Sequence, residues 1–579
     1  MQESYISLYE NEEFIEIYKN NNRLRINRLT DQVSFTTELQ NSSDNTAIKK
    51  PIVYLALFGI INIHGGLLLI IITNRKLVGE FKLGRIWKIT EYEIIHSRRN
   101  YLHVGLDQKA ENQKFVEFID YSMHQNGYYY SNDFDLTLKL QNVYDKTTIN
   151  TFFWNQSLQK PLINCNAHTF FCKFIHGFVE FTQFWINNKC INYILVSRRG
   201  RNSAGTRFYR RGCDEYGNVA NFVETEQIIT INDDIYSYVQ IRGSVPLLWC
   251  QYPNLKYKPY PNLEISRDAQ QDVFLGHFNK IDSYNSIVFV NLLDKKGKEL
   301  ELTYTYSEVI KANIDNFKRR NMSNKLLYEE FEFHKECPGL NWNRLSVLIE
   351  RMKPFLTKND YLKVSSNRIC LVQNGLIRTN CIDCLDRTNV TQSLMALEII
   401  KIQLQEANVI NCGIEITKNQ EFMSKFKNLW ADNADMLSIQ YAGTKALKTD
   451  FTRYGKRTLS GAINDGINSL KRYFINNFND GFRQDSVDFI TGNYSIDDEI
   501  IHTDKQINSR FSFTKTMWTA FILSIVMFFI NILFGDVFTK RKILNVLFWA
   551  SCSLFCGKII FIYGTCFVDK PTLIKVKKD

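Results

Sequence analysis

A cysteine and an arginine frame a short polar loop in RTNCIDCLDRTNV, residues 378–390. Cys381 is followed by Cys384 three positions later and by Arg387 six positions later. The first spacing occurs in redox pairs and in half of a zinc site. The second spacing suits a nucleophilic thiol beside a guanidinium that binds an anion. The residues around the loop decide between these chemistries.

The neighbouring sequence predicts a strand before this loop and a helix after it. Upstream, residues 368–377 indicate a β-hairpin that turns at Asn374-Gly375. Downstream, Val390, Leu394 and Leu397 recur at helical spacing. The loop therefore leads into a helix N-terminus, where backbone N–H groups and the helix dipole can cradle an anion. The loop residues that we assign to substrate binding are Ile382, Cys384 and Leu385.

The same electrostatics favour the thiolate of Cys381, which is the nucleophilic form of cysteine. Arg387 can hold two phosphate oxygens with its planar guanidinium. Thr388 follows it, and its hydroxyl can donate to the thiolate or assist release of a phosphocysteine intermediate. Together these residues predict transfer of a phosphoryl group to cysteine.

Two aspartates inside the loop are candidates for the acid that protonates the leaving alcohol. Asp383 and Asp386 would both lie beside a bound phosphate dianion, which raises the pKa of a carboxyl group. We lean towards Asp386, although the sequence leaves both open. Two carboxylates at this place would also repel further phosphates, so we expect a preference for monophosphates.

A zinc site is a weaker interpretation of the cysteine pair. No second CxxC pair exists in the sequence, and no His–Cys pair follows at a suitable distance, so we expect no metal. A reversible disulfide between Cys381 and Cys384 remains a hypothesis for regulation. Residues 165–176, CNAHTFFCKFIH, match no common zinc-finger order and are expected to supply core cysteines and an incidental histidine.

Composition places most of the chain in a reducing environment. Thirteen cysteines are scattered among 579 residues without the spacing of a disulfide framework. The first residues, MQESYISLYENEEF, are acidic and polar, unlike a signal peptide. The net charge of +11 suits work near an anionic surface. Because the basic runs lack an aromatic stacking platform, we do not expect nucleic acid as the partner.

Two apolar runs near the C-terminus predict a transmembrane hairpin. Residues 517–535 are 19 uncharged positions, about the length that crosses a bilayer as a helix. Residues 543–568 contain one charge, Lys558, which can reach an interface. Basic residues on the flanks favour a cytosolic location for both ends of the hairpin. Lys575 and Lys577 resemble a dilysine signal for retrieval to the endoplasmic reticulum.

The rest of the chain predicts a β-rich region followed by a mixed one. Residues 51–73 are nearly long enough to span a membrane, but Gly65-Gly66 separates halves rich in β-branched residues, which favours two buried strands. Residues 427–443 and 461–478 indicate helices. We divide the chain into a β-rich N-terminal domain (1–178), a catalytic domain (179–505), a linker (506–516), the transmembrane hairpin (517–568) and a cytosolic basic tail (569–579).

Several blocks of the sequence have a common family resemblance. They are RTNCIDCLDRTNV, residues 204–228, 240–251, 430–458 and 476–494, and FGIINIHGGLLLIIITNRKLVG near the N-terminus. Together they resemble the Sac (suppressor of actin) family of phosphoinositide phosphatases, in particular its integral membrane members of the endoplasmic reticulum and Golgi. The resemblance covers almost the whole chain.

The resemblance implies an α/β cysteine-phosphatase-like catalytic domain between a β-rich N-terminal domain and a two-helix transmembrane hairpin. It implies hydrolysis of phosphatidylinositol 4-phosphate, and also of the 3-phosphate, through a cysteinyl-phosphate and without a cofactor. Carried onto this chain, Cys381 is the nucleophile, Arg387 binds phosphate, and Asp383 is an acid or an orienting group. The implied location is the membrane of the endoplasmic reticulum, and also the Golgi, with the catalytic domain in the cytosol.

Basic residues outside the loop suit a membrane substrate. Arg207, Lys445 and Lys448 are our candidates for contacts with the headgroup or the membrane surface. The expected partners are a phosphoinositide substrate, the bilayer, and membrane-contact or coat-retrieval proteins. The alternative function is a non-catalytic tether that binds phosphoinositides at membrane contacts. Cys381→Ser separates the two, because only an enzyme loses turnover.

Overall fold

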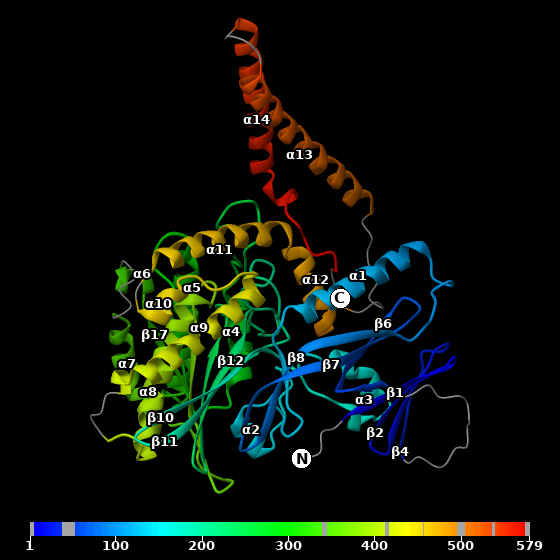
Figure 1. The fold of residues 1–579 in the computed structure, drawn as a ribbon. Helices are drawn as coiled ribbons and strands as arrows, with labels where there is room; N and C mark the ends of the chain where they lie inside the picture. The colour runs from blue at the N-terminus through cyan, green and yellow to red at the C-terminus, as the bar shows by residue number, and fades with distance from the viewer. Residues whose placement is uncertain are drawn as a thin grey trace.

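The computed structural model contains a mixed α/β body from which two long helices project (Figure 1). It describes residues 5–37, 52–338, 344–411, 416–455, 457–494, 504–534 and 539–573. The predicted dilysine residues, Lys575 and Lys577, lie outside the described residues. One large sheet runs through the body, and a smaller sheet packs against its N-terminal part.

The smaller sheet is antiparallel and has the order β4-β3-β2-β1-β5. Ile15 and Ile17 alternate with partly exposed residues, as in a strand with one face in a core. They belong to the same hydrophobic cluster as Leu67 and Leu69 of the large sheet, so the two sheets enclose one apolar layer. The strands are β1 Ile6–Glu10, β2 Phe14–Lys19, β3 Asn22–Asn27, β4 Val33–Thr37 and β5 Ile52–Tyr54.

The apolar run 51–73 forms buried strands joined by a turn, as predicted. Strands β6 and β7 pair in an antiparallel manner on either side of His64-Gly65. The odd-numbered residues from 67 to 71 face the smaller sheet, and the even-numbered residues from 68 to 72 face a second core. Burial on both faces explains why this run has the composition of a membrane segment. The strands are β6 Ala56–Ile63 and β7 Gly66–Phe81.

The large sheet is antiparallel from β6 to β13 and parallel from β13 through β20 and β16 to β17. Its strand β10 spans residue 178, so the sheet continues across the position where we divided the chain. The remaining strands are β8 Gly84–His96, β9 Tyr128–Tyr130, β10 Ile175–Ile186, β11 Lys189–Arg199, β12 Val223–Ile231, β13 Asp234–Arg242, β16 Ser286–Asn291, β17 Leu326–Glu330 and β20 Gly375–Asn380.

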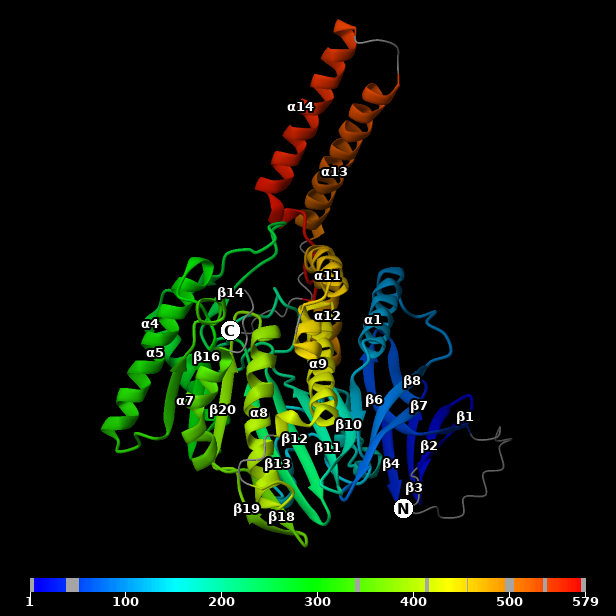
Figure 2. The same cartoon turned by 60° about the vertical axis from the view of Figure 1, so that its left-hand side comes forward.

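Helices cover both faces of the parallel part of this sheet (Figure 2). In β16, Ile287 and Phe289 pack with α4 and α5, whereas Val288 and Val290 belong to the core under α7, α8 and α9. A strand buried on both faces accounts for its unbroken apolar sequence. The helix predicted over 427–443 is confirmed as part of α9. These helices are α4 Arg267–Ile281, α5 Leu300–Arg319, α7 Leu345–Lys358, α8 Asp386–Glu406 and α9 Gln420–Ala442.

The predicted hairpin at Asn374-Gly375 is wrong. Strand β18 (Leu362–Ser365) pairs with β19 (Arg368–Leu371), and the turn between them is Ser366-Asn367, with φ angles of 50° and 62°. Left-handed residues of this kind join antiparallel strands tightly. Asn374 instead accepts backbone hydrogen bonds from Asn285 and Ser286, which directs β20 into the centre of the sheet.

The N-terminal and catalytic parts share a core through α1 and α12. The rings of Phe115 on α1 and Phe489 on α12 stack with centroids 4.8 Å apart. The helix predicted over 461–478 is confirmed as α11. The other elements are α1 Leu106–His124, α2 Leu140–Asp145, α3 Lys160–Asn164, α6 Phe333–Glu336, α10 Thr449–Tyr454, α11 Leu459–Phe478, α12 Asp480–Thr491, β14 Trp249–Cys250 and β15 Asn262–Leu263.

Within the segment 165–176, Cys172 and His176 lie in the core, whereas Cys165 is half-buried and His168 is exposed. Cys172 is buried beside Phe174 in the core that α1 covers. His176 is buried between Tyr128 and Trp154, with ring centroids 4.6 and 4.5 Å away. The segment therefore packs as the sequence suggested.

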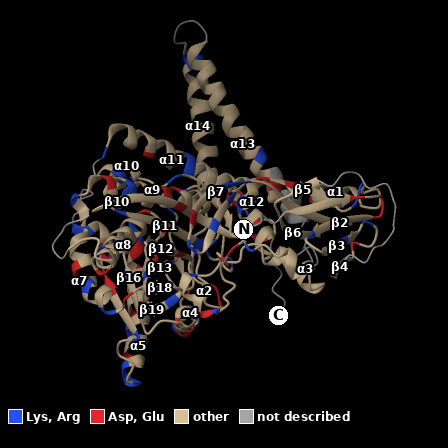
Figure 3. Cartoon of the chain, turned by 60° about the horizontal axis from the view of Figure 1, so that its bottom comes forward, with Lys and Arg blue, Asp and Glu red and all other residues tan. Residues whose placement is uncertain are grey.

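Two helices at the C-terminal end are long and apolar enough to cross a membrane. They are α13 (Asp504–Leu533) and α14 (Lys540–Ile562), and their candidate spans are Phe513–Leu533 and Lys540–Ile562. Figure 3 shows few charged residues along most of their length. Residues 506–516, predicted as a linker, lie within α13. The chain after α14 returns to the body, where Thr572 and Leu573 donate backbone hydrogen bonds to Asp485 on α12.

Candidate active site

The cysteine loop lies at the carboxyl end of the parallel strands. Strand β20 ends at Asn380, directly before Cys381, and α8 begins at Asp386. The neighbouring strand β16 ends at Asn291, and the chain that follows it also reaches the loop. Ligand sites of open parallel sheets form at this edge. The predicted strand–loop–helix arrangement is confirmed.

Cys381 is buried, and its sulfur accepts hydrogen bonds from the loop and from the first turn of α8. The backbone N–H of Cys384 lies 3.1 Å from the Cys381 Sγ, and the Thr388 hydroxyl donates to it over 3.4 Å. Cys384 has a φ of 53°, a left-handed conformation that turns its N–H towards the sulfur. The loop is thus shaped around the sulfur of Cys381.

The environment of Cys381 favours the thiolate. Burial opposes ionisation, but hydrogen bonding with Cys384, the charge of Arg387 and the hydrogen bond from Thr388 outweigh it, so the pKa of Cys381 is lowered to about 5. Burial, together with the adjacent Cys381, raises the pKa of the Cys384 thiol, whose sulfur donates to the Gly243 carbonyl over 2.9 Å. The loop therefore favours a thiolate at Cys381 and a thiol at Cys384.

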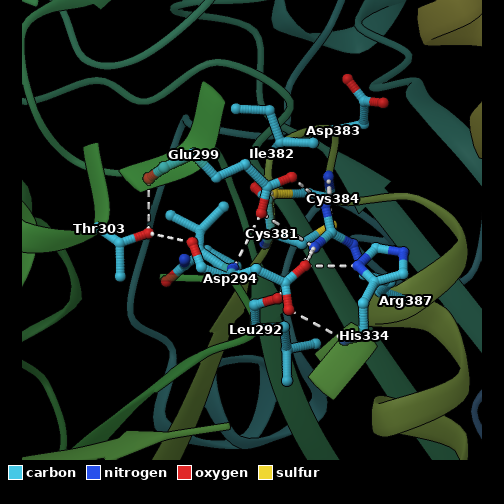
Figure 4. A network of polar contacts seen from close by, with 12 residues as sticks. Leu292, Asp294, Glu299, Thr303, His334, Cys381, Ile382, Asp383, Cys384 and Arg387 are labelled. Atoms are coloured by element: carbon cyan, nitrogen blue, oxygen red, sulfur yellow. Dashed lines mark hydrogen bonds and ion pairs between the residues drawn. The ribbon is translucent and has the colours of Figure 1, made fainter. Parts of the chain in front are cut away.

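Arg387 lies beside Cys381 within a set of acidic side chains (Figure 4). Its guanidinium donates to both carboxylate oxygens of Glu299 over 3.2 and 2.8 Å, and to the Leu292 carbonyl over 3.0 Å. Asp294 lies 3.6 Å from the same guanidinium and accepts from the His334 ring over 2.5 Å. The Glu299 carboxylate thus occupies the pair of Arg387 N–H donors that could bind two oxygens of a phosphate.

Asp383 is held as a carboxylate by two arginines. Arg207 donates to its two oxygens over 3.0 and 2.7 Å, and Arg211 donates over 2.7 Å. Burial opposes its charge, but the two guanidinium groups outweigh burial and lower the pKa of Asp383 below its usual range. A carboxyl group that stays ionised is a poor proton donor. The pairing also removes much of the negative charge from which we argued for repulsion of extra phosphates.

Asp386 has the opposite environment. It begins α8, and one of its oxygens accepts the backbone N–H of Leu447 over 3.2 Å. Burial raises the pKa of Asp386 to about 6, although Arg472 opposes the rise. The pKa values of the two aspartates of one loop therefore differ, which is how one site can assign different roles to two carboxyl groups.

A cavity of about 260 Å³ opens over the loop. Cys381, Asp386 and Arg387 line it, together with Arg207 and Lys448, two of the basic residues that we assigned to headgroup contacts. Lys445 is exposed and lies outside the lining. The basic residues of the lining are Arg207, Arg211, Lys258, Lys298, Arg387, Lys448 and Arg472, and the acidic ones are Glu299, Asp383 and Asp386.

Comparison with known proteins identifies the family. Residues 55–338 match the SacI homology domain. Phosphatidylinositol-3-phosphatase SAC1-A of Danio rerio is 37% identical over 95% of this chain and 94% of its own length. Phosphatidylinositol-3-phosphatase SAC1 of Saccharomyces cerevisiae is 34% identical over 90% of this chain and 85% of its own, and phosphoinositide phosphatase SAC6 of Arabidopsis thaliana is 32% identical over 89% and 88%. This chain belongs to the Sac family of phosphoinositide phosphatases.

Sequence reasoning missed several side chains of this Sac-family site. Glu299 and Asp294 pair with Arg387, and Arg211 pairs with Asp383. The two acids follow the buried strand β16, so acidic residues after a second central strand were an available signal. Arg211 stands four residues after Arg207 in a block already singled out. His334 carries no local signal, because only the fold brings it to Asp294.

Proposed function

We propose that this chain removes the phosphate from phosphatidylinositol 4-phosphate, and also from the 3-phosphate, to give phosphatidylinositol. One observation carries the proposal: a thiolate at Cys381 and a protonatable Asp386 line the same basic cavity. Relatives of this chain are named phosphatidylinositol-3-phosphatases, which supports the substrate class. We expect a monophosphate from this resemblance and no longer from charge repulsion.

In the proposed first step, the Cys381 thiolate attacks phosphorus and the bond between phosphorus and the inositol oxygen breaks. Asp386 gives its proton to the leaving oxygen, so the alcohol departs neutral. The phosphate dianion takes the place of the Glu299 carboxylate in the fork of Arg387, because both ligands offer two oxygens at similar spacing. The product is a cysteinyl-phosphate.

In the second step, water attacks the cysteinyl-phosphate and Asp386 accepts a proton from it. The bond between phosphorus and sulfur breaks, phosphate leaves, and the thiolate returns. Thr388 stabilises the released thiolate through the hydrogen bond that it makes to the sulfur. The steps need no metal or cofactor. We propose accordingly that residues 179–505 form a cysteine-phosphatase-like domain, built on β20, the loop and α8.

We propose that α13 and α14 anchor this domain in the membrane of the endoplasmic reticulum, and also of the Golgi, with the catalytic part in the cytosol. Their length and apolar composition support the anchor. Such an anchor holds the cavity near lipid substrates and raises their local concentration. Membrane-contact and coat-retrieval proteins remain expected partners.

Phosphate release from liposomes that contain single phosphoinositides tests the function. The full chain should hydrolyse the 4-phosphate and the 3-phosphate faster than the 4,5-bisphosphate, and Cys381→Ser should lose turnover. Cys370→Ser is the matched control, because Cys370 is an exposed free cysteine. If wild-type protein binds these liposomes without releasing phosphate, the chain is the non-catalytic tether instead.

A further inference from the structure

Helix α11 is amphipathic, but its apolar side faces outward. Arg472, Asn476 and Asn477 are its buried residues, whereas six large apolar residues are exposed by 39 to 80%. Amphipathic helices of soluble domains normally turn the apolar side inward. A contiguous exposed apolar stripe marks a surface that another apolar phase covers. The residues of this α11 stripe are Leu459, Ile463, Ile467, Leu470, Phe474 and Phe478.

Hydrogen bonds fix α11 in this orientation. Arg472 donates from its Nε to the Thr444 hydroxyl over 2.9 Å and from a terminal nitrogen to the Ser438 hydroxyl over 3.0 Å. Asn476 donates to the buried carboxylate of Asp480 over 3.0 Å. Rotating the helix to hide the stripe would break these buried bonds and leave charged and polar groups unpaired, which is unfavourable in a buried environment. The outward stripe is therefore a property of the folded domain.

The α11 stripe ends at the base of the candidate membrane hairpin. Phe478, its last residue, makes an edge contact with Trp518 of α13, with ring centroids 6.5 Å apart. Figures 1 and 2 show α11 lying across the face of the body from which the hairpin projects. Tryptophan is enriched where membrane helices enter the headgroup region. The contact places the stripe at that level.

A loop between β14 and β15 completes this face. Tyr252, Tyr257 and Tyr260 are exposed by 54, 60 and 64%. The Lys256 ammonium lies 6.0 Å from the centroid of Phe561 on α14, and the Tyr473 hydroxyl of α11 donates to the Leu255 carbonyl over 2.9 Å. The loop thus contacts both α11 and the hairpin. Tyrosine, with an apolar ring and a polar tip, suits a membrane–water interface.

The segment after α14 attaches the hairpin to the same part of the body. The Asp569 N–H donates to the Asn477 carbonyl over 2.8 Å, and Asp569 accepts the N–H of Phe482 over 3.0 Å. Thr572 bonds to Asp485 through its backbone and its hydroxyl. These bonds hold the hairpin base against α11 and α12, so the stripe keeps its position relative to the bilayer.

We propose that the α11 stripe and the three tyrosines lie in the interface of the bilayer that holds the hairpin. Peripheral amphipathic helices bind lipid in this way, with the apolar face below the headgroups. Resting on the proposed function, the arrangement also sets substrate access, because Tyr257 and, from α11, Ser469 and Tyr473 line the catalytic cavity. The cavity then receives headgroups from the protein's own membrane.

Photo-crosslinking tests the surface without relying on turnover. The full chain carrying p-benzoylphenylalanine in place of Ile467 is reconstituted in phosphatidylcholine vesicles with radiolabelled lipid, in the Cys381→Ser background. Irradiation should give a lipid adduct, and the same amino acid in place of Trp185 should not. Trp185 is the matched control, because it is 60% exposed at the end of the β10–β11 pair. No lipid adduct at 467, or an adduct of two protein chains, overturns the proposal.

A kinetic comparison tests the consequence for substrate access. The measured quantity is the ratio of turnover on long-chain lipid in the protein's own vesicle to turnover on a short-chain soluble analogue. In the double variant Ile463→Ser with Ile467→Ser this ratio should fall on the order of tenfold, because two apolar side chains no longer enter the interface. Trp185→Ser should leave the ratio unchanged. An unchanged ratio in the double variant contradicts the proposal. If wild-type protein turns over neither substrate, only the proposed function is contradicted, and the crosslinking result still decides the membrane surface.

Discussion

Replacing Asp386 with asparagine is the sharpest test of the assignment of acid and nucleophile. The substitution keeps the size of the side chain and the acceptor for the Leu447 N–H, which lies 3.2 Å away. It removes the proton that the leaving oxygen needs. Asp383→Asn is the matched control, because it changes the neighbouring aspartate of the same loop, whose carboxylate pairs with Arg207 and Arg211.

The pKa values set the expected pH profile. In the proposed mechanism, activity of the free enzyme requires the Cys381 thiolate, so kcat/KM should rise with pH through about 5. It also requires protonated Asp386, so kcat/KM should fall as pH rises through about 6. At pH 7 about one tenth of the enzyme would retain that proton, by the ordinary titration relation. The optimum should therefore lie between these two values.

The assay compares two leaving groups over this pH range. An inositol alkoxide needs the proton, so Asp386→Asn should lower kcat on a soluble phosphatidylinositol 4-phosphate by about 10²-fold or more and remove the descending limb. The leaving group of a nitrophenyl phosphate departs as a stable phenolate without needing a proton, so kcat on this substrate should fall much less in Asp386→Asn. Asp383→Asn should affect both substrates equally and keep both limbs, because Asp383 remains ionised throughout.

Two outcomes would refute this reasoning. One is an equal loss on both substrates in Asp386→Asn, since a group that only positions the substrate does not distinguish leaving groups. The other is a descending limb that persists in Asp386→Asn and disappears in Asp383→Asn. Circular dichroism at each pH checks that the variants stay folded.

Two further predictions concern the sulfur and the segment after the hairpin. Thr388→Val removes the hydroxyl that donates to Cys381, so the pKa of the thiol should rise and the pH midpoint of inactivation by iodoacetamide should move upward; an unchanged midpoint would contradict this role. Asp485→Ala removes the acceptor of the Thr572 N–H and hydroxyl, at a cost of about 0.5–1.5 kcal/mol for each lost hydrogen bond. The backbone amides of Thr572 and Leu573, which donate to Asp485, should then exchange hydrogen for deuterium faster than in wild-type protein, and equal exchange rates would show that the segment is held by other contacts.

Local patterns in the sequence predicted several secondary-structure elements, including the helix that follows the cysteine loop. Spacing of apolar residues predicted α8 behind the loop, and the paired apolar halves of 51–73 predicted β6 and β7. Such patterns depend on residues that are close together in the sequence, so they can be found without knowing the tertiary structure. The same approach failed at Asn374-Gly375, because the turn that closes the strand pair is Ser366-Asn367 and β20 joins partners distant in sequence.

The sequence by itself determined which residue types meet in the cysteine loop, and where apolar helices follow. Only the tertiary structure decided what those residues can do. Arg207 lies 176 positions from Asp383, yet it fixes that carboxylate as an anion, while burial leaves Asp386 as the group that can carry a proton. Likewise the period of α11 is visible in the sequence, but the buried bonds of Arg472 turn its apolar stripe outward. Protonation and orientation depend on burial and on long-range partners, which local spacing does not encode.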